Sequence, residues 1–251
     1  VDPAGTLRKS GPSLRFVEEK LDLAFLYDWI WNPRNFRDNT RMPRFFGLDQ
    51  HLQNDEKSLA ITHDLEPIEV RGVVAFLMDR SQNFEPLPRP QGIDDWSDEE
   101  MIARGKVQFE TRGCLACHTH HDFPDTSKFR TKNEIVQGPD LSNVGQKFSG
   151  QTNPKGPAWL YSWIKEPTKY HARTVMPNLF LDPAKDAKGK TYDPAEDITM
   201  FLLADNNGKW KPIVPANELS TDASLSKEQQ AALLDLTVEY LNEPFFKDDV
   251  L

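Results

Sequence analysis

The chain has 251 residues, of which 38% are hydrophobic, and its formal net charge is −9 at pH 7. An acidic balance of this size argues against nucleic acid as a partner, because nucleic-acid binding needs a basic footprint. No run of apolar residues approaches the length of a membrane-spanning helix. The length suits two small domains with connecting segments.

The first third of the chain predicts two helices. The segment Leu26–Pro33 resembles Leu160–Pro167, where a helix is expected to end near the proline because the residue before a proline is disfavoured in the helical conformation. A second helix is expected over Pro67–Asp79, with an apolar side made of Val73, Phe76 and Leu77. The segment 85–96, rich in proline and acidic residues, is interpreted as a linker.

The rest of the chain predicts four more helices, at Asp98–Arg112, 159–166, Pro194–Ala204 and 226–241. The first opens with a capping box of Ser97 and Glu100 and stops at Gly113. Turn residues at Gly138–Leu141 and a polar segment, 206–224, separate these elements. The pattern predicts an all-α fold with long loops.

The sequence Cys-Leu-Ala-Cys-His at residues 114–118 has the spacing of a c-type haem attachment site. Two thiols at this spacing can each add to one vinyl group of a haem, and His118 can then reach the iron. Cys-x-x-Cys alone also occurs in redox pairs and zinc sites. Cys114 and Cys117 are the only cysteines, so no thiols remain for a disulfide framework or a four-cysteine zinc site.

Together with its flanking elements, this motif resembles the class I cytochrome c domain over Ser97–Asp205. The resemblance implies thioether links at Cys114 and Cys117 and an iron bound by His118 and, on the opposite face, by the sulfur of Met176. A thioether ligand raises the reduction potential, and an iron with both axial positions filled is suited to carry electrons.

The resemblance also assigns the surroundings of the haem. It implies that the Pro139 carbonyl accepts a hydrogen bond from His118, that Leu141 packs on that side of the ring, and that Trp163 stands where the family often has tyrosine. In the family the first helix crosses the last, and the matching positions here are Gly105, Phe109, Ile198 and Phe201.

The other methionines and histidines have simpler interpretations. Methionine among apolar residues is usually core filler, which is expected for Met78, Met101 and Met200. His171 is a weak rival of Met176 as iron ligand. The remaining histidines are expected to be polar surface residues: His51, His63, His120 and His121.

The chain also contains an internal repeat. Leu26–Pro33 matches Leu160–Pro167, and with a constant offset Trp29 pairs with Trp163 and Met42 with Met176. Gly11–Leu14 likewise matches Gly138–Leu141. Residues 1–80 therefore resemble a second cytochrome c domain without its first helix and Cys-x-x-Cys-His motif. The missing helix is expected to leave an apolar surface, lined by Leu14, Leu26, Trp29, Ile30, Val73, Phe76 and Leu77.

Two explanations of this incomplete repeat remain open. The chain could be a piece of a larger multihaem protein, with Met42 as ligand of a second haem iron, or the first module could be a haem-free docking domain. We favour the first explanation. The basic side chains of this module, which are Arg34, Arg37, Arg41 and Arg44, have two interpretations of equal weight: a solvated surface, or partners of haem propionates or an acidic protein.

The expected organisation is an incomplete cytochrome c-like domain at 1–84, a linker at 85–96, a complete domain at 97–205, and a linker with a C-terminal helix at 206–251. The expected function is electron transfer by haem c between redox proteins or neighbouring haem domains. The alternatives are a catalytic, peroxidase-like multihaem enzyme with an open iron and a haem-free docking module joined to one cytochrome domain. Covalent haem attachment implies a periplasmic or otherwise extracytoplasmic location.

Overall fold

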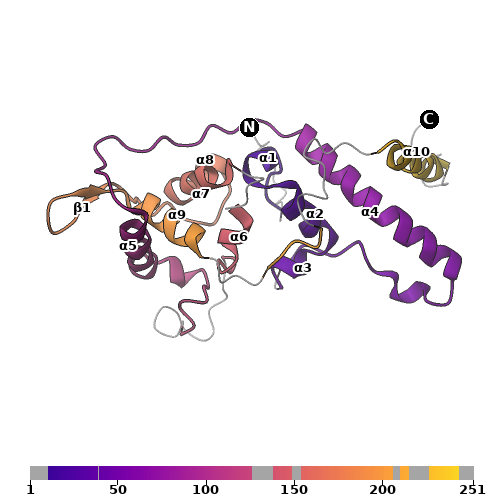
Figure 1. Cartoon of the computed structure of the whole chain (residues 1–251), viewed down its shortest axis with the longest axis horizontal. Coiled ribbons are helices and arrows are strands. Elements are labelled where there is room, and N and C mark those ends of the chain that lie inside the picture. Colours follow the sequence, from indigo (N-terminus) through magenta and orange to yellow (C-terminus); the bar gives the residue numbers. More distant parts are fainter. Residues whose placement is uncertain are drawn as a thin grey trace. The chain divides into compact units, whose positions relative to one another are not determined.

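The computed structural model describes residues 11–38, 40–125, 138–148, 154–205, 210–214 and 226–242, and these are mostly helical (Figure 1). The all-α class predicted from the sequence is confirmed. A two-stranded antiparallel hairpin was not predicted; it pairs β1 (Ala184–Lys185) with β2 (Thr191–Tyr192).

The chain divides into two compact units, which are described separately. Unit 1 comprises Val1–Leu21 and Ser81–Lys211, and unit 2 comprises Asp22–Arg80 and Pro212–Leu251. In unit 1 the helical elements are α1 (Val17–Lys20), α5 (Asp98–Thr111), the 3-10 turn η2 (Cys114–Ala116), α6 (Val144–Phe148), α7 (Gly156–Lys165), α8 (Pro167–Tyr170) and α9 (Pro194–Ala204). In unit 2 they are α2 (Leu23–Trp31), α3 (Pro33–Phe36), the 3-10 turn η1 (Asp49–Leu52), α4 (Glu56–Asp79) and α10 (Lys227–Asn242).

Helices α5 and α9 of unit 1 cross at Gly105 and lie side by side (Figure 1). A Cβ atom added to Gly105 would lie 2.0 Å from the carbonyl oxygen of Asp197 and 2.9 Å from the Cβ of Phe201. The ring of Phe109 packs against Phe201 with 5.6 Å between centroids. Glycine therefore allows two helix backbones to approach this closely, and the predicted crossing of these helices is confirmed.

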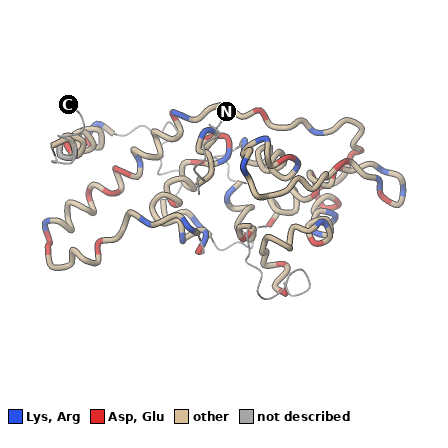
Figure 2. The backbone as a smooth tube through the Cα atoms, turned by 180° about the vertical axis from the view of Figure 1, so that it is seen from behind, with Lys and Arg blue, Asp and Glu red and all other residues tan. Residues whose placement is uncertain are grey.

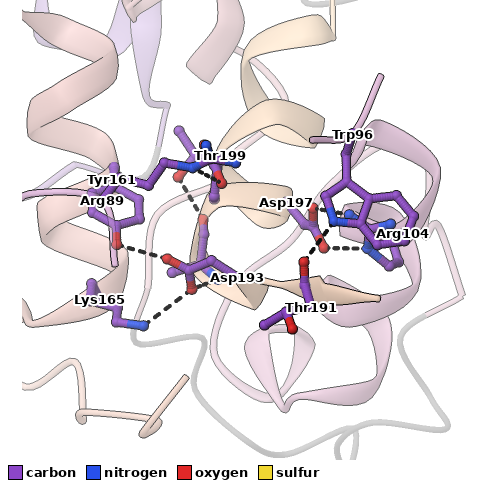
Figure 3. Close-up of polar contacts among 11 residues, drawn as sticks. Arg89, Trp96, Arg104, Tyr161, Lys165, Thr191, Asp193, Asp197 and Thr199 are labelled. Carbon is purple, nitrogen blue, oxygen red and sulfur yellow. Dashed lines mark hydrogen bonds and ion pairs between the residues drawn. The ribbon is translucent and has the colours of Figure 1, made fainter. Parts of the chain in front are cut away.

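A polar network joins α5, α7 and α9 (Figure 3). Arg104 donates from Nε and Nη2 to the two carboxylate oxygens of Asp197, at 2.6 and 2.8 Å. The buried carboxylate of Asp193 accepts from the Tyr161 hydroxyl at 2.7 Å and from Lys165 Nζ at 3.1 Å. Because each buried carboxylate has a cation or hydroxyl partner, its desolvation is largely offset.

The segment expected to be a linker is docked along unit 1. Its backbone at Leu87 donates to Ser162 at 2.8 Å, and Arg89 pairs with Glu196 at 2.9 Å. Trp96 donates from its indole nitrogen to the carbonyl of Thr191 at 2.8 Å (Figure 3). These contacts make 85–96 part of the packing of unit 1.

Residues 11–21 also belong to unit 1, where the sequence grouped them with the first domain. The backbone of Gln82 donates to Arg15 at 2.7 Å, and the Tyr170 hydroxyl donates to the carbonyl of Phe16 at 3.2 Å. Lys155 pairs with Glu19 at 2.7 Å. The position of α1 thus depends on contacts with α7, α8 and residues 81–84.

Unit 2 contains the long helix α4, which begins at Glu56 rather than at the expected Pro67. The Asp55 side chain caps it by accepting from the Ser58 backbone at 3.1 Å. Pro67 therefore lies inside the helix, although proline is most favoured in the first turn. Helix α10 packs on α4, where Leu233 lies 3.5 Å from a Cβ built on Gly72.

The apolar surface expected on unit 2 is only partly present. Val73 and Phe76 of α4 are exposed, at 41% and 61%. Leu26 and Ile30 of α2 are buried instead. Within the described part of the chain, no helix has both the length and the apolar character needed to cross a bilayer.

Candidate functional site

The Cys-x-x-Cys-His segment forms one tight turn directly after α5. Gly113 ends the helix in the left-handed conformation, with φ of 87°. The carbonyl oxygen of Cys114 then accepts from the backbone of Cys117 at 3.1 Å and of His118 at 2.9 Å. Cys114, Cys117 and His118 therefore all belong to this one turn.

The His118 ring is oriented by the Pro139 carbonyl, which lies 2.8 Å from Nδ1. A carbonyl oxygen can only accept, so Nδ1 carries the proton and the lone pair of the neutral ring is on Nε2. This contact was predicted and is present. An orienting partner of this kind fixes the tautomer and raises the basicity of a metal-binding histidine.

Gly138 lets the two segments approach each other. A Cβ at this position would lie 2.5 Å from Cε1 and Nδ1 of His118 and 2.9 Å from the carbonyl oxygen of Cys117. The backbone of Gly138 donates to Cys117 at 3.0 Å, and that of Leu141 donates to Thr119 at 2.9 Å. The segment after Gly138 therefore lies directly against the cysteine turn.

The environment of Cys114 lacks the main feature of a reactive redox pair. Both cysteines are partly buried and neither is in a disulfide. Burial raises the pKa of the Cys114 thiol to about 11. A reactive Cys-x-x-Cys pair has a lowered thiol pKa, because the thiolate is the nucleophile, so this environment argues against dithiol–disulfide chemistry.

Three of the predicted site residues contact one hydrophobic core. Cys114, Leu141 and Trp163 are partly buried and pack against the core of unit 1. Met176 is partly buried in the loop after α8, where its backbone donates to the Thr174 hydroxyl at 3.1 Å. The structure thus places Cys114, Leu141 and Trp163 around a common core, with Met176 on a loop of the same unit.

The repeat recognised in the sequence is also a repeat of local geometry. Helices α2 and α3 join at Asn32, with φ and ψ of −149° and 89°, and α7 and α8 join at Glu166, with −147° and 81°. In both pairs a proline follows at the start of the short helix. In the loop after α3, Met42 donates from its backbone to Thr40 at 3.2 Å, as Met176 does to Thr174.

The aromatic side chains of the two helix pairs repeat as well. The first set is Phe25, Trp29 and Phe36, and the second is Trp159, Trp163 and Tyr170. The first and second rings stack at 6.1 and 5.4 Å, with interplanar angles of 13° and 18°. The first and third rings meet edge-on at 4.8 and 4.9 Å, at 85° and 84°. Each unit therefore holds its methionine loop on the same helix–proline–helix scaffold.

Four arginines of unit 2 flank Met42 in the sequence, and Figure 2 colours the basic residues along the backbone. Arg44 has a structural role, because it donates to the carbonyls of Phe46 and Gly47 at 2.7 and 2.8 Å. Arg34 and Arg41 are exposed. The two interpretations of this basic loop therefore apply to the remaining arginines.

Two residues near the site were not recognised from the sequence. His120 was expected to be exposed, which is wrong: it is buried against Phe109 and Phe201, with ring centroids 5.7 and 5.1 Å away. Lys20 of α1 has its ammonium 4.4 Å from the Trp159 ring and 6.0 Å from the Trp163 ring. Burial lowers the pKa of Lys20 to about 8. Both positions depend on contacts between distant segments, which no local pattern signals.

The other histidines follow the expectations more closely. His51 and His63 are exposed, and His63 pairs with Asp49 at 2.6 Å. His121 is exposed, as expected, with 32% of its side chain accessible.

Comparison with known proteins identified no relative: neither a family model, nor a curated protein, nor a solved structure matches the chain. The resemblance to class I cytochrome c rests on the motif residues named above.

Proposed function

We propose that the chain is a c-type cytochrome that transfers electrons, with haem c attached to Cys114 and Cys117 and its iron bound by His118 and Met176. The observation that carries the proposal is the hydrogen bond between His118 Nδ1 and the Pro139 carbonyl, 2.8 Å long, next to the Cys-x-x-Cys-His turn. That bond leaves Nε2 as the metal-binding atom of a ring that is already oriented.

The chain's own residues fit this cofactor in three respects. The two cysteines lie at the attachment spacing, and they are not paired in a disulfide. Gly138 provides the space that a close approach to His118 requires. Leu141 and Trp163 supply apolar surface beside the thiols, and an apolar surrounding tunes the potential of a buried iron. When bound, the haem supplies the one-electron chemistry.

We also propose that the Met42 loop of unit 2 is a second haem-binding element. Its support is the repeated geometry, because Met42 stands on the same scaffold as Met176. Both cysteines of the chain lie in unit 1, so thiols for a covalent haem beside Met42 would come from another polypeptide segment. The exposed arginines of this loop are then candidates to pair with haem propionates or an acidic redox partner.

The proposed partners are redox proteins or neighbouring haem domains. Because thioether attachment of haem in bacteria takes place outside the cytoplasm, we propose a periplasmic or otherwise extracytoplasmic location.

The two methionines provide a matched test of the ligand assignment. In chain produced in a host that attaches haem c, Met176→Ala should abolish the sulfur-to-iron charge-transfer band, give a high-spin or water-ligated iron, and lower the potential. Met42→Ala changes the equivalent loop of unit 2, which has no attachment thiols of its own in this chain, and should leave the band of the haem at Cys114 and Cys117 intact. An oxidised spectrum unchanged by Met176→Ala would contradict ligation by Met176 and point to His171 or another base.

A further inference from the structure

A second group of side chains that could hold a metal ion includes two residues shortly after His118 in the sequence. It consists of His120, His121 and Asp205, each of which offers one donor atom, and these atoms all lie within 4.8 Å of one another. Nε2 of His120 is 3.1 Å and Nε2 of His121 is 3.0 Å from the same carboxylate oxygen, Oδ2 of Asp205. Donors bound to one tetrahedral zinc are roughly 3.3–3.5 Å apart, given metal–ligand distances of about 2.0–2.2 Å. The cluster is therefore close to the size of a coordination site.

His120 supplies an independent sign of a ligand. Its side chain is fully buried, and its Nε2 atom has no hydrogen-bond partner among the described residues, although it lies close to Asp205. A buried polar nitrogen without a hydrogen bond costs free energy. A metal ion at the point where the three donors converge would satisfy this atom.

The donors are held in place before any ion binds. The His120 ring is packed among the rings of Phe109, Phe123 and Phe201. Asp205 follows the last residue of α9, and its backbone is fixed by α6: a Cβ on Gly145 would lie 2.3 Å from the Asp205 carbonyl oxygen. The carboxyl end of a helix favours a positive charge.

We propose that His120, His121 and Asp205 form a binding site for a divalent transition-metal ion of the Zn²⁺ type, separate from the haem iron. Imidazole and carboxylate are ligands that Zn²⁺ accepts, and three protein ligands leave a coordination position for water. The partly exposed His121 side chain gives the ion a route from solvent.

One contact must change when the ion binds. The Asp122 backbone N–H donates to Nδ1 of His120 at 3.2 Å, so the metal-free ring carries its proton on Nε2. Coordination through Nε2 moves this proton to Nδ1, and the Asp122 amide must turn away. The loss is one long hydrogen bond, and metal binding is expected to depend on pH because ligands compete with protons.

The test is a Zn²⁺ titration of the full chain in competition with a chromophoric chelator. The chain keeps any haem that it carries, and any free thiols are alkylated beforehand. We expect one Zn²⁺ per chain. His121→Gln and Asp205→Asn should each weaken Zn²⁺ binding by roughly 10–100-fold or more, because loss of an outer-shell partner alone has an effect of that size. His63→Gln is the matched control, because it removes another histidine paired with an aspartate, Asp49, and should leave binding unchanged.

Absence of binding at equimolar micromolar Zn²⁺ would overturn the proposal, and so would equal affinities of the wild type and His121→Gln. X-ray absorption at the zinc edge of the wild-type protein identifies the ligand atoms and does not require any variant to fold. Imidazole and oxygen ligands would support the site, whereas sulfur ligation would reject it.

Discussion

Gly138 tests the architecture of the candidate haem site at the scale of a single residue. In Gly138→Ala, the new Cβ would collide with the His118 ring, 2.5 Å away, and with the Cys117 carbonyl, 2.9 Å away. We expect less covalently bound haem and a loss of stability of about 1–3 kcal/mol, as for other overpacked sites. Haem content per chain and denaturant unfolding measure the two effects.

Gly11→Ala is the matched control, because Gly11 is the counterpart of Gly138 in the sequence repeat and has no atom within 4 Å of the added Cβ. It should leave haem content and stability unchanged. Equal behaviour of the two variants would show that Gly138 has no packing role.

Single residues also show how far the sequence could predict the site. The contact of His118 with Pro139 was expected only from the resemblance to class I cytochrome c, in which the residue matching Pro139 accepts a hydrogen bond from the histidine. The burial of His120 was not, because it depends on Phe201 and Asp205, which are far away in the sequence. A polar residue in a polar stretch carries no local sign that a distant helix will cover it.

At the scale of elements, two helical glycines should respond to alanine with opposite signs. Gly105→Ala forces α5 away from α9, since its Cβ would lie 2.0 Å from the Asp197 carbonyl, and should destabilise unit 1 by about 1–3 kcal/mol or more. Gly72→Ala meets only Leu233 at an ordinary 3.5 Å and should stabilise α4 by about 0.5–1 kcal/mol. Denaturant unfolding followed by circular dichroism distinguishes them, and two changes of the same sign would contradict the assigned packing.

The capping box at the start of α5 predicts how the stability of this helix end depends on pH. The Glu100 carboxylate accepts from the Ser97 backbone at 3.0 Å and from its hydroxyl at 3.1 Å, and these bonds hold the pKa of Glu100 below its ordinary value. Their stabilising effect is therefore present above the ordinary glutamate pKa and is lost as the pH falls through the lowered one.

Ser97→Ala should raise the pKa of Glu100 toward its ordinary value, which a carboxyl NMR titration can follow. The pKa of Asp55, held low by its hydrogen bond with Ser58, serves as internal reference and should not move. If the pKa of Glu100 is the same in both proteins, the Ser97 hydroxyl does not contribute to lowering it.

The sequence predicted elements well where a local signal marks their ends. Ser97 begins α5, Pro167 ends α7 and Pro194 begins α9, as expected. Pro67 misled the assignment of α4, because a proline tolerated inside a helix has the same local signature as one in the first turn. The hairpin was missed because strands of two residues have no measurable periodicity.

At the scale of the whole molecule, the internal repeat is the feature that local patterns predicted best. The aromatic triads and the methionine loops have the same geometry in both units, because each of them is specified by a short stretch of consecutive residues. The division into units was harder to predict. Segment 11–21 and segment 85–96 join unit 1 through long-range hydrogen bonds, such as those to Tyr170 and Ser162, that composition does not encode.

The central claim, covalent haem at Cys114 and Cys117, is tested most directly by the intact mass of the denatured chain after production in a host that attaches haem c. The account predicts a mass increased by one haem, and the double variant Cys114→Ala, Cys117→Ala should show none of this increase. A wild-type chain of unmodified mass, with any haem lost on denaturation, would contradict the account.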